Sequence, residues 1–158
     1  MRFVADGMLG KLTRWLRMLG QDVEYSNNME DSELLAIAKE ERRILLTRDS
    51  ELYQRSTGKG VEAFYLEGLT GEEKLAEVAK KYGLPLEIDM SESRCPKCNS
   101  LIKPISPEEA SDKVEKNTLE HYHEFWQCSK CQQVYWQGAH WTRISNSLCK
   151  AKEILEKQ

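Results

Sequence analysis

The sequence contains no apolar run close to the roughly 18 residues that a membrane-spanning helix needs. Its first residues also lack the apolar stretch of a secretory signal peptide, because an acid stands at Asp6. These two absences predict a cytoplasmic protein that does not enter a membrane. No glycine-rich phosphate-binding loop is present either, which disfavours hydrolysis of nucleoside triphosphates.

The sequence also lacks an excess of positive charge, since its 158 residues carry a net charge of −3. Residues 1–90 hold 13 Lys and Arg against 17 Asp and Glu, a net charge of −4, whereas residues 91–158 hold 10 against 9, a net charge of +1. Neither half has the basic surface of a protein that reads DNA sequence. A nuclease is compatible with this balance, because its acidic residues can hold a divalent metal.

Short apolar segments alternate with segments of helical period through the first ninety residues. We expect strands at 3–5, 23–25, 44–46 and 61–66, and helices at 8–19, 30–42, 50–55 and 71–82. This alternation predicts an α/β fold, a parallel sheet flanked by helices on both faces. Sites in such sheets lie outside the carboxyl ends of the strands.

Acidic residues occupy these strand ends. Asp6 follows the first strand, Asp31 lies in the connection after the second, and Asp49 follows the third. Three carboxylates at close range repel one another, and a hard cation such as Mg²⁺ or Mn²⁺ relieves the repulsion. A metal held in this way can promote hydrolysis of a phosphodiester. The alternative is local, because Asp31 and Asp49 each stand where a helix begins and can act as a cap.

Basic residues stand close to these acids in the sequence. Lys11, Arg14 and Arg17 recur every three residues and therefore share one face of the first helix, and Arg48 directly precedes Asp49. We interpret Lys11, Arg14 and Arg48 as candidates for contact with a substrate phosphate. The alternative for the helical residues is an ordinary solvated face.

Four cysteines in the last third form two C-x-x-C pairs: Cys95 with Cys98, and Cys128 with Cys131. Paired knuckles of this kind supply the four sulfur ligands of a tetrahedral Zn²⁺ site. Disulfides are disfavoured without a secretory signal. Because sulfur fills every position, the predicted zinc is structural and stabilises a segment too small to fold alone.

An aromatic segment, 134–143, follows the second knuckle. Its side chains can build the small core of a zinc ribbon and dock it on the first domain, or stack on bases. We expect Trp136 to dock and leave Trp141 and Arg143 open between these roles. Cys149, beyond this segment, is expected to be a buried or half-buried residue that does not bind metal.

Three segments, 3–17, 44–49 and 128–143, resemble the Mut7-C ribonuclease family. The resemblance implies a PIN-like nuclease domain in residues 1–90, followed in residues 91–158 by a small zinc-ribbon domain with a C-terminal helical tail. It also implies that Asp6, Asp31 and Asp49 bind Mg²⁺ or Mn²⁺ for RNA cleavage. A fourth acid is not fixed by the pattern: Glu30 and Glu33 neighbour Asp31, and Glu67 is a weaker candidate.

The leading hypothesis is therefore a metal-dependent ribonuclease acting on single-stranded RNA, with the ribbon positioning the RNA or docking a protein partner. The second hypothesis is a non-catalytic RNA-binding or docking adaptor with a degenerate site. Acids tied up as helix caps, or pointing apart, favour this second hypothesis. A third is a hydrolase of small phosphoesters, which requires a closed pocket lined by acids.

Overall fold

The structure is a computed structural model that describes residues 1–157. Its N-terminal part consists of β1 (Arg2–Ala5), α1 (Gly10–Met18), β2 (Asp22–Tyr25), α2 (Asp31–Glu40), β3 (Ile44–Thr47), α3 (Ser50–Gly58), β4 (Ala63–Tyr65) and α4 (Gly71–Tyr82). The four strands pair in the order β2-β1-β3-β4, and every pair is parallel. The predicted α/β architecture is thus confirmed.

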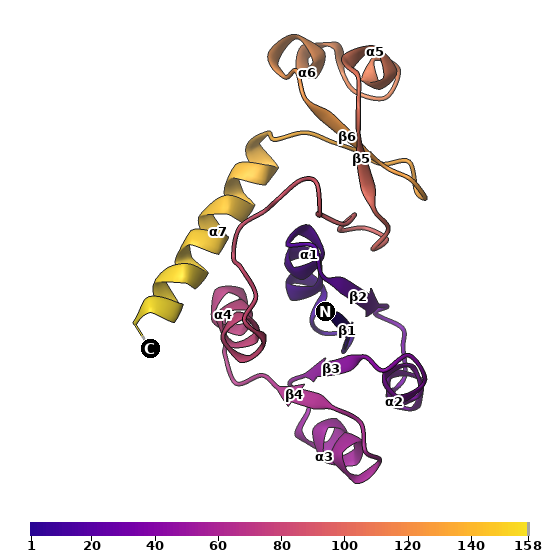
Figure 1. The fold of residues 1–158 in the computed structure, drawn as a ribbon, viewed down its shortest axis with the longest axis vertical. Helices are drawn as coiled ribbons and strands as arrows, with labels where there is room; N and C mark the ends of the chain where they lie inside the picture. Colours follow the sequence, from indigo (N-terminus) through magenta and orange to yellow (C-terminus); the bar gives the residue numbers. More distant parts are fainter. Residues whose placement is uncertain (158) are drawn as a thin grey trace.

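Alternating side chains along the strands build one core on each face of this sheet. Phe3, Ala5 and Leu46 pack on one side with residues of α1 and α4, whereas Val4 and Leu45 pack on the other side with α2 and α3. Burial on both faces is the reason that these strands read as continuous apolar runs. The two layers of helices are visible on either side of the strands in Figure 1.

The first helix begins later than its apolar period predicts. The predicted helix spans 8–19, but α1 begins at Gly10, and Met8 is 69% exposed. The backbone N–H of Leu9 instead donates to the carbonyl of Asp6 at 2.9 Å, which closes a turn after β1. Met8 therefore belongs to a loop beside the strand end.

A second, antiparallel sheet follows, with β5 (Ile102–Ile105), β6 (Phe125–Cys128) and β7 (Val134–Tyr135) paired in that order. Between β5 and β6 the chain forms two short helices, α5 (Pro107–Ala110) and α6 (Lys116–His121). Trp136, which we expected to dock on the first domain, packs in the small core under these helices, where its ring centre lies 6.4 Å from that of Phe125.

The last helix, α7 (Ala139–Glu156), runs from the second sheet back along α4 (Figure 1). Ile144, Leu148 and Ala151, one face of this helix, join the core that also contains α1 and α4. The predicted domain boundary at residue 90 lies between the two sheets. The helix α7 follows the second sheet in sequence, but it packs against α4 of the N-terminal part. No helix within residues 1–157 has the length and apolar character needed to cross a membrane.

Candidate functional site

The carboxyl ends of β1 and β3 are neighbours, and a threonine connects the acids that follow them. In the parallel register Ala5 lies opposite Leu46, so Asp6 comes next to Thr47. The buried hydroxyl of Thr47 donates a hydrogen bond to Oδ2 of Asp6 at 2.9 Å. The same hydroxyl accepts one from the backbone N–H of Asp49, also at 2.9 Å. The structure therefore brings Asp6 and Asp49 to one edge of the sheet.

Asp49 is the N-cap of α3. Its Oδ1 accepts hydrogen bonds from the backbone N–H groups of Glu51 at 2.9 Å and Leu52 at 3.2 Å, which confirms the local interpretation of this residue. Both bonds use the same oxygen, and within residues 1–157 Oδ2 accepts no hydrogen bond. The second oxygen is therefore available to another ligand.

Asp31, at the first position of α2, faces a different partner. Its Oδ2 lies 3.5 Å from Nη1 of Arg55 on α3, and both side chains are nearly half exposed. Among the residues that the structure describes, the four cysteines alone form a group of three or more His, Cys, Asp or Glu whose ligand atoms all lie within 4.8 Å of one another. The structure thus does not bring Asp31 that close to both Asp6 and Asp49.

The predicted phosphate contacts differ in their surroundings. Lys11 and Arg14 are exposed on α1, and Nζ of Lys11 lies 5.1 Å from the ring centre of Trp15. Arg48 stands between Thr47 and Asp49, and its Nε is buried without a hydrogen-bond partner among residues 1–157. A buried donor without a partner costs free energy, which an anion bound at this place recovers.

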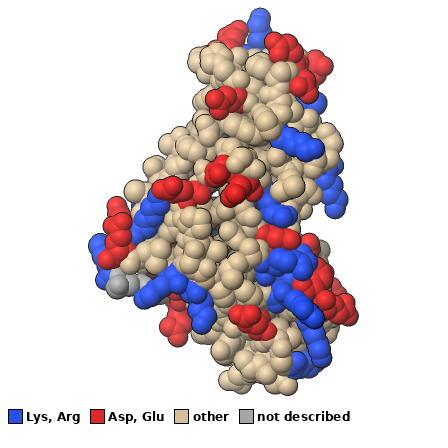
Figure 2. All heavy atoms as spheres, in the orientation of Figure 1, with Lys and Arg blue, Asp and Glu red and all other residues tan. Residues whose placement is uncertain are grey.

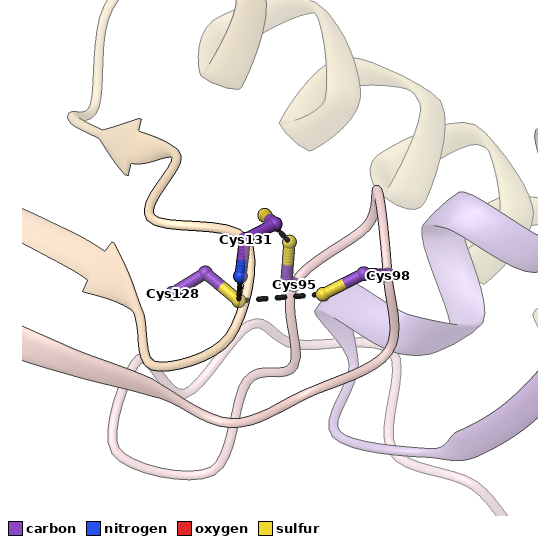
Figure 3. A group of neighbouring side chains, drawn as sticks. All are labelled: Cys95, Cys98, Cys128 and Cys131. Atoms are coloured by element: carbon purple, nitrogen blue, oxygen red, sulfur yellow. Dashed lines mark hydrogen bonds between the residues drawn. The ribbon is translucent and has the colours of Figure 1, made fainter.

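The four cysteine sulfurs converge from two loops (Figure 3). The Sγ atoms of Cys98 and Cys128 lie 3.3 Å apart, and those of Cys95 and Cys131 lie 3.7 Å apart. In a tetrahedral site with Zn–S bonds of about 2.3 Å, the sulfurs are separated by about 3.8 Å. The tetrad therefore fits a metal such as zinc, as the two knuckles predict.

The backbone has a similar conformation in both cysteine knuckles. The residue after each second cysteine, Asn99 or Gln132, has a left-handed conformation with φ of 74° or 68°. In the second knuckle the backbone N–H groups of Lys130 and Cys131 donate to the sulfur of Cys128 at 3.4 Å. Such bonds favour a thiolate, which is the form that binds metal, but burial outweighs them at Cys128 and raises the pKa of its thiol.

Hydrogen bonding and burial give the thiols of Cys95 and Cys98 different pKa values. Burial raises the pKa of the Cys95 thiol to about 12, although the hydroxyl of Tyr135 contacts this sulfur at 2.9 Å. At Cys98, burial acts in the same direction but is outweighed by hydrogen bonds from the backbone of Ser100 and from Cys128, which lower its pKa to about 6.

The first knuckle is attached directly to the first sheet. Arg17, expected on the exposed basic face of α1, is 5% exposed and donates to the carbonyls of Val23 and Pro96. Asn99 binds the same edge strand, because its Oδ1 accepts from the backbone N–H of Val23 at 3.0 Å. The metal loops, α1 and β2 therefore form one connected unit.

A family model of the Mut7-C RNAse domain matches residues 1–148. The chain belongs to the Mut7-C RNAse family. No curated protein and no solved structure matches it. The match extends over the strand-end acids, the cysteine tetrad and α7 as far as residue 148, so the family domain includes both sheets of this Mut7-C protein.

Nothing in the sequence indicated that Thr47 contacts Asp6 or that Asn99 binds Val23 in this Mut7-C protein. A threonine at the end of a buried strand is typical of any sheet, and its contact with Asp6 depends on pairing between residues 41 positions apart. Asn99 is separated from Val23 by 76 positions. Asn after a C-x-x-C pair does indicate a left-handed turn, but not the strand to which it binds.

Proposed function

We propose that this Mut7-C protein is a divalent-metal-dependent ribonuclease that hydrolyses phosphodiester bonds of mainly single-stranded RNA. The observation that carries the proposal is the Thr47 hydroxyl, which holds the Asp6 carboxylate and the backbone of Asp49 at the carboxyl edge of the sheet. Ligands in catalytic metal sites are oriented by partners of this kind.

The proposed metal ligands are Asp6, Asp31 and Asp49. Their carboxylate oxygens are the donors that Mg²⁺ and Mn²⁺ prefer. A cation bound there supplies Lewis-acid assistance at the phosphate and offsets the charge of the carboxylates. Asp31 has to leave Arg55 to take part, and this costs little because an exposed ion pair contributes only about 0–1 kcal/mol.

Arg48, Lys11 and Arg14 are the proposed phosphate contacts. Arg48 is the best placed of them, because it is adjacent in sequence to both Thr47 and Asp49 and its buried Nε has no partner among residues 1–157. A guanidinium binds phosphate oxygens in a fixed fork, which holds the scissile group in one orientation.

The cysteine tetrad has a structural role in this proposal. Zn²⁺ is the metal that four thiolates favour, and four sulfur ligands leave no position for substrate or water. Zinc here would fix the knuckles against α1 and β2, through the contacts of Arg17 and Asn99.

Cleavage of end-labelled single-stranded RNA in Mn²⁺ tests the proposal, with Asp6→Asn beside the wild type. The matched control is Glu40→Gln, which also neutralises one carboxylate but lies at the far end of α2 from the strand-end acids. We expect metal-dependent cleavage by the wild type and the control, and loss of cleavage in Asp6→Asn. Cleavage by Asp6→Asn at the wild-type rate would falsify the proposed mechanism.

A non-catalytic RNA-binding or protein-docking adaptor is the second candidate. Two observations favour it, because Asp49 already caps α3 and Asp31 already pairs with Arg55. The same assay separates the two candidates when RNA binding is measured alongside. Binding without cleavage by the wild type, in Mn²⁺ and in Mg²⁺, is the result that the adaptor predicts.

A further inference from the structure

Two adjoining hollows run along α1, between this helix, the first cysteine knuckle and α7. The first, about 410 Å³, lies between α1 and α7 and is lined by Lys11, Arg14 and Arg143 among others. The second, about 300 Å³, lies between α1, β2 and the knuckle, and its lining includes Arg14, Lys97 and Tyr25. Arg14 and Pro96 line both hollows, so the two adjoin, and we call them together the track.

The charge of this track differs from that of the protein as a whole. The chain has a net charge of −3, and on the face drawn in Figure 2 basic side chains are interspersed with acidic ones. The lining of the two hollows contains no Asp or Glu. Four exposed cations border it, and none of them forms a salt bridge within residues 1–157: Lys11, Arg14, Lys97 and Arg143.

An apolar floor lies between these cations. Trp15, Met18 and Ile144 line the hollow between α1 and α7. Cations that form no salt bridge, placed beside apolar surface, are suited to bind a polymer that carries one anion per unit and a planar or sugar group between the anions. Single-stranded nucleic acid has this chemistry, whereas a small phosphorylated molecule needs only one such position.

The track leads toward the strand-end acids. Tyr25 and Gly10 line its second hollow, and the Tyr25 hydroxyl donates to the carbonyl of Gly7 at 2.6 Å. Gly7 directly follows Asp6. The second hollow therefore borders the loop that follows Asp6 at the end of β1.

We propose that this track binds the sugar–phosphate backbone of single-stranded RNA beyond the cleaved bond, with Arg143 of α7 and Lys97 of the knuckle as contacts additional to Arg14. The identity of the polymer as RNA rests on the proposed function, but the binding surface does not require cleavage. In this proposal α7 and the first cysteine knuckle both contribute to RNA binding, because each forms one wall of the track.

The test measures binding separately from cleavage. A fluorescein-labelled single-stranded 2′-O-methyl oligonucleotide is titrated with the full zinc-containing chain, without Mg²⁺ or Mn²⁺, and the dissociation constant is followed by anisotropy over a series of salt concentrations. The variants are Arg143→Gln, Arg14→Gln and the double variant. Lys150→Gln is the matched control, because Lys150 is an exposed cation two turns further along α7 that lines neither hollow.

The slope of log affinity against log salt concentration is negative. Each single variant should make this slope less negative by about 0.7, the value for one lost phosphate contact on a single strand. The double variant should bind about tenfold more weakly at low salt. Lys150→Gln and the conservative Arg143→Lys should keep the wild-type slope, and retained zinc in every protein shows that the fold is intact.

An unchanged slope in Arg143→Gln, or no binding of the oligonucleotide by the wild type, overturns the proposed track. The outcome is independent of the proposed activity. Cleavage in Mn²⁺ with a normal slope in Arg143→Gln supports the ribonuclease but contradicts the track. Binding that depends on Arg143 in a protein that does not cleave supports the track and contradicts the ribonuclease.

Discussion

Asn99 and Asp22 join the cysteine knuckle to the edge of the parallel sheet. The amide Nδ2 of Asn99 donates to Oδ1 of Asp22 at 2.7 Å, while Oδ1 of the same amide accepts from the backbone of Val23. One side chain in the left-handed turn after Cys98 thus satisfies two groups of β2. The metal loops are therefore held by the edge of the parallel sheet as well as by the small core that Cys95 and Cys128 form with Ile102 and Trp126.

Replacing Asn99 should destabilise the protein through this connection. Asn99→Gly keeps the left-handed conformation but loses the bonds to Asp22 and Val23, and we expect a loss of about 2–3 kcal/mol in the free energy of unfolding. Asn99→Ala should lose about 1–2 kcal/mol more, because a Cβ disfavours positive φ. Urea unfolding with zinc bound measures both values.

The second knuckle supplies the control for Asn99. Gln132 has the same left-handed conformation, but among residues 1–157 its side-chain amide bonds only to the carbonyl of Ser129, at 3.3 Å. Gln132→Gly should therefore change the free energy of unfolding by about 1 kcal/mol or less. Equal losses in Asn99→Gly and Gln132→Gly would show that the bonds of Asn99 to β2 contribute nothing.

Asp22 should make the stability depend on pH at the acid end. Burial acts to raise its pKa, but hydrogen bonds from Arg43 and Asn99 and the charge of Arg43 outweigh burial and lower it below the ordinary 3.8. A carboxyl whose pKa is lower in the folded state contributes stability that is fully present above the unfolded value. This contribution is lost as the pH falls through the folded pKa.

Asp22→Asn should therefore be less stable than the wild type at neutral pH, and the difference should shrink as the pH falls below about 4. Urea unfolding of both proteins between about pH 7 and about pH 3 gives the two curves. Release of zinc at acid pH affects both proteins, so the difference between the curves reports Asp22. Curves that stay parallel over this range would contradict a lowered pKa of Asp22 in the folded protein.

Features that depend on neighbours in the sequence could be predicted from it. The alternation of strands and helices gave the parallel sheet, and the spacing of Cys95, Cys98, Cys128 and Cys131 gave the tetrad, because two tight turns fix each pair of sulfurs. The position of Asp6 and Asp49 at strand ends followed from the same alternation. Their connection through Thr47 did not, because it depends on which strands pair.

Features that depend on long-range packing could not be predicted. Arg17 has the spacing of an exposed basic stripe, but the knuckle covers it and supplies a carbonyl acceptor from Pro96. Asp31 stands where a helix cap or a ligand is expected, but α3 places Arg55 beside it. Cys149, expected to be at least half-buried, is exposed because α7 turns a different face to α4.

The exposed Cys149 offers a matched control for the metal centre. Cys98→Ser or Cys128→Ser removes one of the four proposed sulfur ligands, and we expect loss of the zinc proposed for the tetrad together with unfolding of the second sheet. Cys149→Ser should keep full zinc content, because its side chain lies outside the tetrad. Metal analysis by mass spectrometry and far-UV circular dichroism provide the two readouts. Zinc retained in Cys128→Ser would mean that the tetrad is not the metal centre.

The Thr47 hydroxyl should matter more to cleavage than to folding. Thr47→Val keeps the shape of the buried side chain but removes the hydrogen bonds to Asp6 and from Asp49. Loss of a residue that orients a metal ligand typically costs about 10- to 100-fold in activity or metal affinity. We expect a decrease of about this size in the rate of RNA cleavage at limiting Mn²⁺, partly restored at high Mn²⁺.

The control for Thr47→Val is Ser56→Ala, which also removes a buried hydroxyl but one that bonds only to a carbonyl within α3. Both variants should lose about 1 kcal/mol or somewhat more in the free energy of unfolding. Only Thr47→Val should shift the Mn²⁺ concentration that gives half-maximal cleavage. If both variants cleave RNA with the same Mn²⁺ dependence as the wild type, Thr47 does not position a metal ligand and Asp6 acts without it.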